Sequence, residues 1–168
     1  MPPRNPVPWL MTDERMGEAL WPALRRLPPG GGVVFRHHAT PPAVRRALLR
    51  RVERIAAARR LVLLVAGGGG SGKAAGYGRS RGAHGAAAHD RRDAERAARA
   101  GARLLFVSPV FATRSHPGAA AIGPRAAARI GRGLGASVIA LGGMTARRWR
   151  RIRRLGFDGW AAIDAWTR

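Results

Sequence analysis

Residues 108–118 read SPVFATRSHPG and residues 137–145 read SVIALGGMT, and these two stretches decide the fold. In each stretch a polar or glycine-rich loop follows directly on an apolar run, residues 104–107 in the first and 137–141 in the second. In a parallel α/β protein the loops at the carboxyl ends of the strands bind ligands, and a glycine pair before a helix leaves backbone N–H groups for a phosphate. Both stretches therefore predict one ligand-binding face with two anion-binding loops.

Outside these loops, apolar runs alternate with helical patterns. The apolar runs are short and lack polar alternation, which predicts strands that are buried on both faces; they cover residues 32–35, 61–65, 104–107, 137–141 and 160–163. Helices are predicted over residues 42–60, 93–100 and 124–132, and from an N-cap at Thr145 to a stop at Gly156. Strict alternation of strands and helices predicts a parallel sheet. In the first of these helices, one buried face is predicted to hold Val44, Leu48, Val52 and Ile55.

The length and composition limit the class of protein. A chain of 168 residues is expected to form a single domain, residues 1–168. The absence of cysteine excludes disulfides and thiolate metal sites. No apolar run approaches the roughly 18 residues that span a membrane, and no signal-peptide core follows Met1. The sequence therefore predicts a soluble, cytoplasmic protein.

The net charge of +22 and the pI of about 12.0 favour contact with phosphates. However, Lys73 is the only lysine, and arginines occur in every predicted helix, which indicates a general compositional bias. Aromatic residues that could stack on bases are scarce. The composition predicts no specific nucleic-acid binding, and only non-specific association at low salt.

Residues 67–74, GGGGSGKA, resemble a phosphate-binding Walker A loop after an apolar strand. Ala74 occupies the position of the hydroxyl that would contact Mg²⁺, and no helix-forming run follows. The stretch is therefore predicted to be a loop with a solvated Lys73.

Several segments, in one order, resemble the thiamine phosphate synthases and their TenI relatives. The matching segments are MTDER at 11–15, FRHH at 35–38, GARLLFVSPVF at 101–111, TRSHPG at 113–118, IG at 122–123, ALGGM at 140–144 and GFDGWAAI at 156–163. The resemblance implies a TIM-type (β/α) barrel, which usually needs roughly 200 residues or more. We therefore expect a shortened, incomplete barrel in which residues 67–89 replace a strand, a helix and another strand edge. A homodimer would cover any open edge.

The resemblance also implies a reaction, the joining of hydroxymethylpyrimidine diphosphate to thiazole phosphate with release of pyrophosphate and help from Mg²⁺. By position, Arg36 matches the arginine that grips the pyrophosphate. His38 and His116 stand where the family has lysines, and Thr113 and Ser115 match phosphate-binding hydroxyls. Ordinary turn capping is the alternative role for the two hydroxyls.

Two further loops are assigned to phosphate by the same resemblance. Gly142 and Gly143 match the pair that cradles the phosphate. The second loop begins at Ile163 and Asp164, where a serine is usual in the family. Because a carboxylate repels phosphate, the alternative role of Asp164 is to cap a short last helix that contains Trp166.

The sequence departs from the family at the magnesium site. Where the family carries its two metal carboxylates, this chain has VAG at 65–67 and GAHG at 82–85. The nearest substitutes are Asp13, Glu14, Asp90 and Asp93. Two alternatives follow. One is a degenerate barrel that binds a phosphorylated ligand without turnover. The other is a metal-independent thiazole tautomerase, which would need His84 or His89 as its base, because Pro109 occupies the position of the tautomerase histidine.

Overall fold

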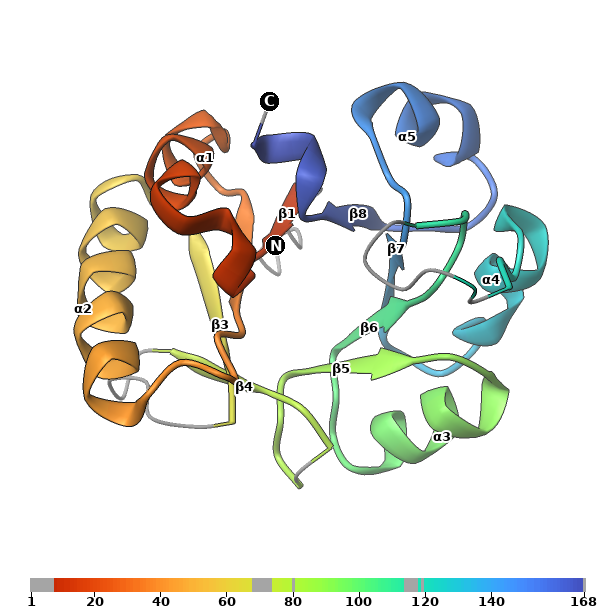
Figure 1. The fold of residues 1–168 in the computed structure, drawn as a ribbon. Coiled ribbons are helices and arrows are strands. Elements are labelled where there is room, and N and C mark those ends of the chain that lie inside the picture. Colours follow the sequence, from red (N-terminus) through yellow and green to blue (C-terminus); the bar gives the residue numbers. More distant parts are fainter. Residues whose placement is uncertain (1–7, 68–73, 80, 114–117, 119, 168) are drawn as a thin grey trace.

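The computed structural model describes residues 8–67, 74–79, 81–113, 118 and 120–167. Eight parallel strands form a closed barrel, in which β1 pairs with both β2 and β8 (Figure 1). The strands are β1 Pro8–Met11, β2 Gly32–Phe35, β3 Val62–Ala66, β4 Ala75–Tyr77, β5 Gly85–Ala88, β6 Leu104–Val107, β7 Ser137–Leu141 and β8 Gly159–Ala162. The TIM-type fold is confirmed. The expected loss of a strand is wrong, because β4 and β5 complete the circle.

The shortening of the barrel falls on its helices. The helical elements are the 3₁₀ helix η1 Glu14–Ala19, α1 Leu20–Arg26, α2 Pro42–Ala58, α3 Arg91–Arg99, α4 Pro124–Ile130, α5 Ala146–Ile152 and the 3₁₀ helix η2 Asp164–Trp166. In Figure 1 they surround the strands, but the described residues between β3 and β5 contain no helix. β4 ends at Tyr77 and β5 begins at Gly85, so only residues 78–84 separate the two strands in the sequence.

Three aromatic rings fill the centre of the barrel. The Trp9 ring meets Phe106 edge-on at 5.2 Å between centroids, and Tyr77 meets the same ring at 5.4 Å. The Trp9 ring fits only because the residue that faces it, Gly32, has no side chain. A Cβ on Gly32 would lie 2.2 Å from the ring. Burial raises the pKa of Tyr77 to about 12, so its phenol stays protonated at neutral pH. Large and small residues therefore alternate across the barrel interior, which keeps it packed.

The buried face of α2 differs from the predicted one. Leu49, Val52 and Ala56 are buried, whereas the side chain of Val44 is 53% exposed. The buried stripe is thus rotated by about one residue from the predicted stripe, and the prediction for Val44 is wrong.

Every described strand has a partner on each side, so the described barrel has no open sheet edge. The reason given above for a second subunit, the covering of such an edge, therefore does not apply. Of the helices that the structure describes, none combines the length and the apolar character needed to cross a membrane.

Candidate functional site at the barrel mouth

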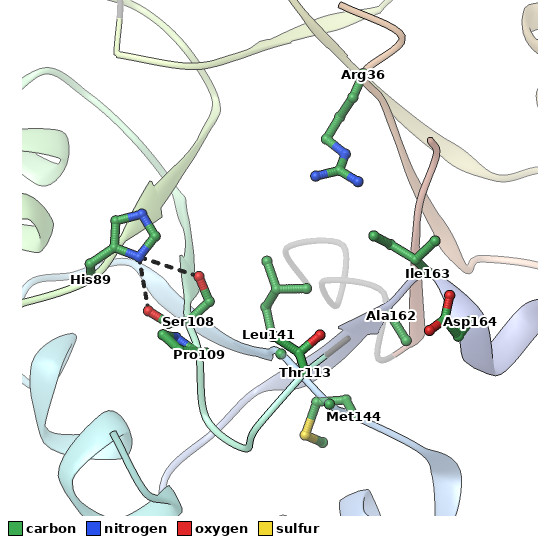
Figure 2. A pocket seen from close by; sticks show the side chains of 12 residues that line it. Arg36, His89, Ser108, Pro109, Thr113, Leu141, Met144, Ala162, Ile163 and Asp164 are labelled. Carbon is green, nitrogen blue, oxygen red and sulfur yellow. Dashed lines mark hydrogen bonds between the residues drawn. The ribbon is translucent and has the colours of Figure 1, made fainter. Parts of the chain in front are cut away.

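A cavity of about 210 Å³ lies at the carboxyl ends of the strands. Its lining includes six of the residues predicted to bind phosphate or substrate: Arg36, Thr113, Gly142, Gly143, Ile163 and Asp164. It also includes His89, one of the two bases proposed for the tautomerase alternative. The other lining residues are Ser108, Pro109, Leu141, Met144 and Ala162. In Figure 2, Arg36 extends toward the cavity from β2, while His89 and Ser108 lie on the opposite side. The sequence loops that were predicted to share one face do meet there.

Arg36 is held in place by the end of β1. Its Nε donates to the Thr12 carbonyl oxygen at 2.9 Å, and its Nη2 donates to Asp13 Oδ2 at 3.3 Å. Its Nη1 has no hydrogen-bond acceptor among the described residues and is available to an anion. A guanidinium that is fixed in this way is suited to anion binding, because little side-chain entropy is lost on contact.

Asp13 is part of the same network. Burial raises the pKa of this carboxyl, but hydrogen bonds from Arg15 and the charges of Arg15 and Arg36 outweigh burial and hold its pKa below the usual value. Asp13 therefore stays ionised and orients Arg36.

Thr12 and His37 form a buried support that the sequence reasoning missed. The Thr12 side chain is fully buried, and its Oγ accepts from the backbone N–H of Arg36 at 3.0 Å. The same Oγ lies 3.0 Å from Nδ1 of His37, whose ring stacks on Phe35. Burial lowers the pKa of His37, which keeps its imidazole neutral at pH 7. No local sequence signal marked Thr12, because β1, the strand that it follows, was not predicted from the sequence.

The loop after β7 requires glycine at both positions. Gly142 and Gly143 have φ values of +95° and +61°, in the region that disfavours other residues. A Cβ on Gly142 would lie 2.8 Å from Pro109 Cα, and one on Gly143 would lie 2.5 Å from the Ala112 carbonyl oxygen. The loop thus packs closely against the 108–112 segment and presents backbone to the cavity.

Arg148 fixes the orientation of this loop. Its Nη1 donates to the Gly143 carbonyl, and its guanidinium lies over the Phe111 ring at 4.6 Å. Because a trans peptide directs its C=O and N–H to opposite sides, the Met144 N–H points away from Arg148. Within the described residues, the amides of Gly143 and Met144 donate to no protein acceptor. These N–H groups can donate hydrogen bonds to an anionic oxygen.

His89 is positioned by two contacts at the end of β5. Its backbone N–H donates to Asp93 Oδ2 at 3.2 Å, and its ring Nδ1 lies 2.9 Å from the Ser108 carbonyl oxygen. Since a carbonyl only accepts, Nδ1 carries the proton and the neutral ring has an unprotonated Nε2. In the described residues this Nε2 meets no hydrogen-bond partner. The ring can therefore accept a proton.

Some predicted residues do not reach the cavity. His38 is exposed and is not in the cavity lining, and neither is His84. Asp164 is the first residue of η2, and Ile163 is the N-cap residue. The prediction that Asp164 caps this helix is therefore wrong by one position. Ser115, His116 and Lys73 lie outside the described residues.

The acids near the mouth do not fit a magnesium site, because among the described residues Asp164 is the one carboxylate in the cavity lining and the others are engaged elsewhere. The strands β3 and β4 end in Ala66 and Tyr77, and the sequence has no Asp or Glu between Glu53 and Asp90. Asp13 is bound by two arginines, and Glu14 accepts from the Ala39 N–H at 2.8 Å. Asp90 and Asp93 are engaged at the start of α3. No group of three metal-ligating side chains occurs in the described part of the chain. We therefore derive no step through Mg²⁺.

Fold and mouth together define a class: a TIM-type barrel of eight parallel strands with a glycine-lined cavity at its carboxyl end. The sequence pattern of the family described as thiamine monophosphate synthase (TMP-TENI) matches residues 79–166, which is more than half of the chain. The chain belongs to this thiamine monophosphate synthase family. No curated protein matches the sequence.

Several solved structures share this fold. Thiamine phosphate pyrophosphorylase from Pyrococcus furiosus superposes with a TM-score of 0.78 at 19% identity, over 97% of this chain and 88% of that chain. The protein of the same description from Bacteroides thetaiotaomicron gives 0.58 at 17% identity, over 95% and 83%. A structure described as native KDPGal gives 0.62 at 14% identity, over 94% and 82%. At these identities the likeness concerns the fold.

Proposed function

We propose that the barrel mouth binds a phosphorylated thiazole of the thiamine pathway without a metal ion. The observation that carries the proposal is the loop after β7. Among the described residues the amides of Gly143 and Met144 have no protein acceptor, and both residues line the same cavity as the fixed Arg36. Backbone amides and an arginine are common ligands of phosphate. The apolar side chains of Leu141, Met144 and Ile163 supply a surface for a small heterocycle.

Condensation with hydroxymethylpyrimidine diphosphate, which the family description suggests, is the reaction that this mouth is least equipped to perform. Departure of pyrophosphate develops charge that Mg²⁺ normally stabilises. The acid-free ends of β3 and β4 offer no carboxylate for that ion.

The test combines binding with product formation. Purified protein is titrated with thiazole phosphate in EDTA and in Mg²⁺, and is then incubated with both phosphorylated precursors. The proposal predicts equal affinity in the two buffers, and an Arg36→Lys variant that binds about tenfold more weakly, because Lys cannot contact Thr12, Asp13 and an anion at once. The matched control is Arg125→Lys on α4, which is exposed and is not among the residues that line the cavity. Thiamine phosphate that forms only with Mg²⁺ would contradict the metal-free proposal.

The geometry of His89 favours a second candidate function, metal-independent proton transfer on the bound heterocycle. An imidazole that has Nδ1–H directed at a carbonyl and Nε2 unpaired can remove a proton and return it. His89→Asn retains a polar side chain but cannot exchange protons near neutral pH. We expect this variant to keep its affinity for thiazole phosphate and to lose exchange of ligand C–H protons with D₂O, measured by NMR. Unchanged exchange would eliminate this role.

A further inference from the structure

The arginines of the chain are not evenly balanced by acids. On α3, Arg91 and Arg99 both contact Glu95, at 2.8 and 3.3 Å, and Arg96 contacts Asp93. By contrast, the sequence contains no Asp or Glu between Glu95 and Asp158. The arginines between Glu95 and Asp158 therefore have no acid in the same stretch of chain to balance them.

This charge is concentrated on α5 and the turn that follows it. Six arginines occur within eight residues, and all six are exposed: Arg147, Arg148, Arg150, Arg151, Arg153 and Arg154. In the part of the chain that the structure describes, none of the six forms an ion pair with a carboxylate. Arg148 contacts the Gly143 carbonyl and the Phe111 ring at the mouth, so we call the other five arginines the α5 basic face.

The neighbouring helix extends the surface. Helix α4 joins β6 to β7, and α5 joins β7 to β8, so the two helices are adjacent around the barrel (Figure 1). Arg125, Arg129 and Arg132, at and after α4, are also exposed. A polyanion that crosses this side of the barrel meets two rows of guanidinium groups.

Such a face is costly for an isolated protein. Like charges three or four residues apart on a helix repel each other, as Arg147 does with Arg150 and Arg151. Helix α2 differs, because Glu53 lies among its arginines. Arg45 donates to the Ala66 carbonyl, Arg51 lies over the Trp21 ring, and Arg59, the C-cap residue, donates to the Leu27 carbonyl. Neutralisation by phosphates would remove the repulsion on α5.

We propose that the α5 basic face binds the phosphodiester backbone of nucleic acid, without sequence preference, at a site separate from the barrel mouth. Guanidinium groups contact phosphate oxygens in pairs, and each contact releases condensed counterions. This binding site goes beyond the proposed function.

The test measures binding of labelled single-stranded RNA, single-stranded DNA and duplex DNA, each of 20 nucleotides, against salt concentration. The variant R147Q/R150Q/R154Q is compared with R46Q/R50Q/R54Q on α2, which removes the same charge from exposed positions. For single strands, the α5 variant is expected to weaken binding by about fivefold per lost contact at 0.1 M salt and to reduce the salt slope by about 0.7 per contact. The α2 variant is expected to change the affinity by less than about threefold.

Equal losses in the two variants would overturn the proposal, because they would mean that only total charge matters. Competition by thiazole phosphate at concentrations that fill the mouth would also overturn it, as would tighter binding of polyglutamate than of an oligonucleotide of equal charge. Circular dichroism checks the fold of both variants. If the triple α5 variant is unfolded, R150Q/R154Q is compared with R50Q/R54Q by the same criteria.

Discussion

Gly143 is the residue on which the proposed phosphate site depends most directly. Replacement by Ala places a Cβ 2.5 Å from the Ala112 carbonyl oxygen, at a φ of +61° that costs a non-glycine residue roughly 1–2 kcal/mol. We predict that Gly143→Ala weakens binding of thiazole phosphate at least about tenfold in calorimetric titration.

The control for this prediction is Gly133→Ala. Gly133 has a φ of +75° and nothing within 4 Å of an added Cβ, so this variant carries the strain without the collision. Both variants should lose stability, and only Gly143→Ala should lose affinity. If the two variants bound the ligand equally well, the loop would not be the phosphate site.

His37 gives the barrel a pH-dependent stability. Because burial lowers the pKa of His37, the unfolded chain takes up a proton at a higher pH than the folded chain does. The contribution to the free energy of unfolding is therefore complete above about pH 6.5 and is lost as the pH falls. We predict that urea unfolding shows lower stability at pH 5.5 than at pH 7.5, and that His37→Asn reduces this difference. If His37→Asn lost as much stability between pH 7.5 and pH 5.5 as the wild type does, groups other than His37 would cause the pH dependence.

At the scale of the element, the start of α3 positions His89. Asp90 caps the helix by accepting from the Asp93 N–H at 2.7 Å, and Asp93 accepts from the His89 N–H. We predict that Asp90→Ala costs about 1 kcal/mol of stability and also disturbs the His89 ring, seen as a shift of its imidazole NMR signals. Thr145→Ala, which removes the corresponding cap of α5, should cost a similar amount and leave those signals unchanged. If the imidazole signals of His89 did not shift in Asp90→Ala, the Asp90 cap would have no role in positioning His89.

The elements that could be predicted from the sequence are those with a strong local pattern. The apolar runs of β2, β3, β6, β7 and β8 were predicted, as were the cap at Thr145 and helices over most of α2, α3 and α4. The strands β1, β4 and β5 read PWLM, AGY and GAAA, which have no strand signature of their own. Their pairing comes from barrel closure, which no local pattern encodes.

The candidate site divides in the same way. Arg36, Gly142 and Gly143 line the cavity, as predicted, because Arg36 and Gly142 directly follow strands with a strong apolar pattern and Gly143 comes next. His38 did not, because the adjacent His37 takes the buried position against Phe35 and leaves His38 outside. The support from Thr12 depends on the pairing of β1 with β2. The contact between Thr12 and Arg36 could not be predicted from the sequence, because it depends on which residues of β1 and β2 lie opposite each other.

For the whole molecule, the barrel interior depends on the match between Trp9 and Gly32. An added Cβ on Gly32 would overlap the indole ring, so Gly32→Ala is predicted to lower the free energy of unfolding by roughly 1–3 kcal/mol. The strand glycine Gly76 is the control, since a Cβ there makes only an ordinary contact at 3.7 Å with Ala83. Trp9→Leu combined with Gly32→Ala should be more stable than the sum of the single changes predicts. Additive losses in urea unfolding would mean that the two residues do not share this space.

The measurement that tests the central claim most directly is calorimetric titration of the wild-type protein with thiazole phosphate in EDTA, repeated with Mg²⁺. The account predicts saturable binding with one site per chain and the same dissociation constant in both buffers, because amides and Arg36 hold the phosphate. Binding that is absent in EDTA and appears with Mg²⁺ would contradict it, and so would the absence of binding in both buffers.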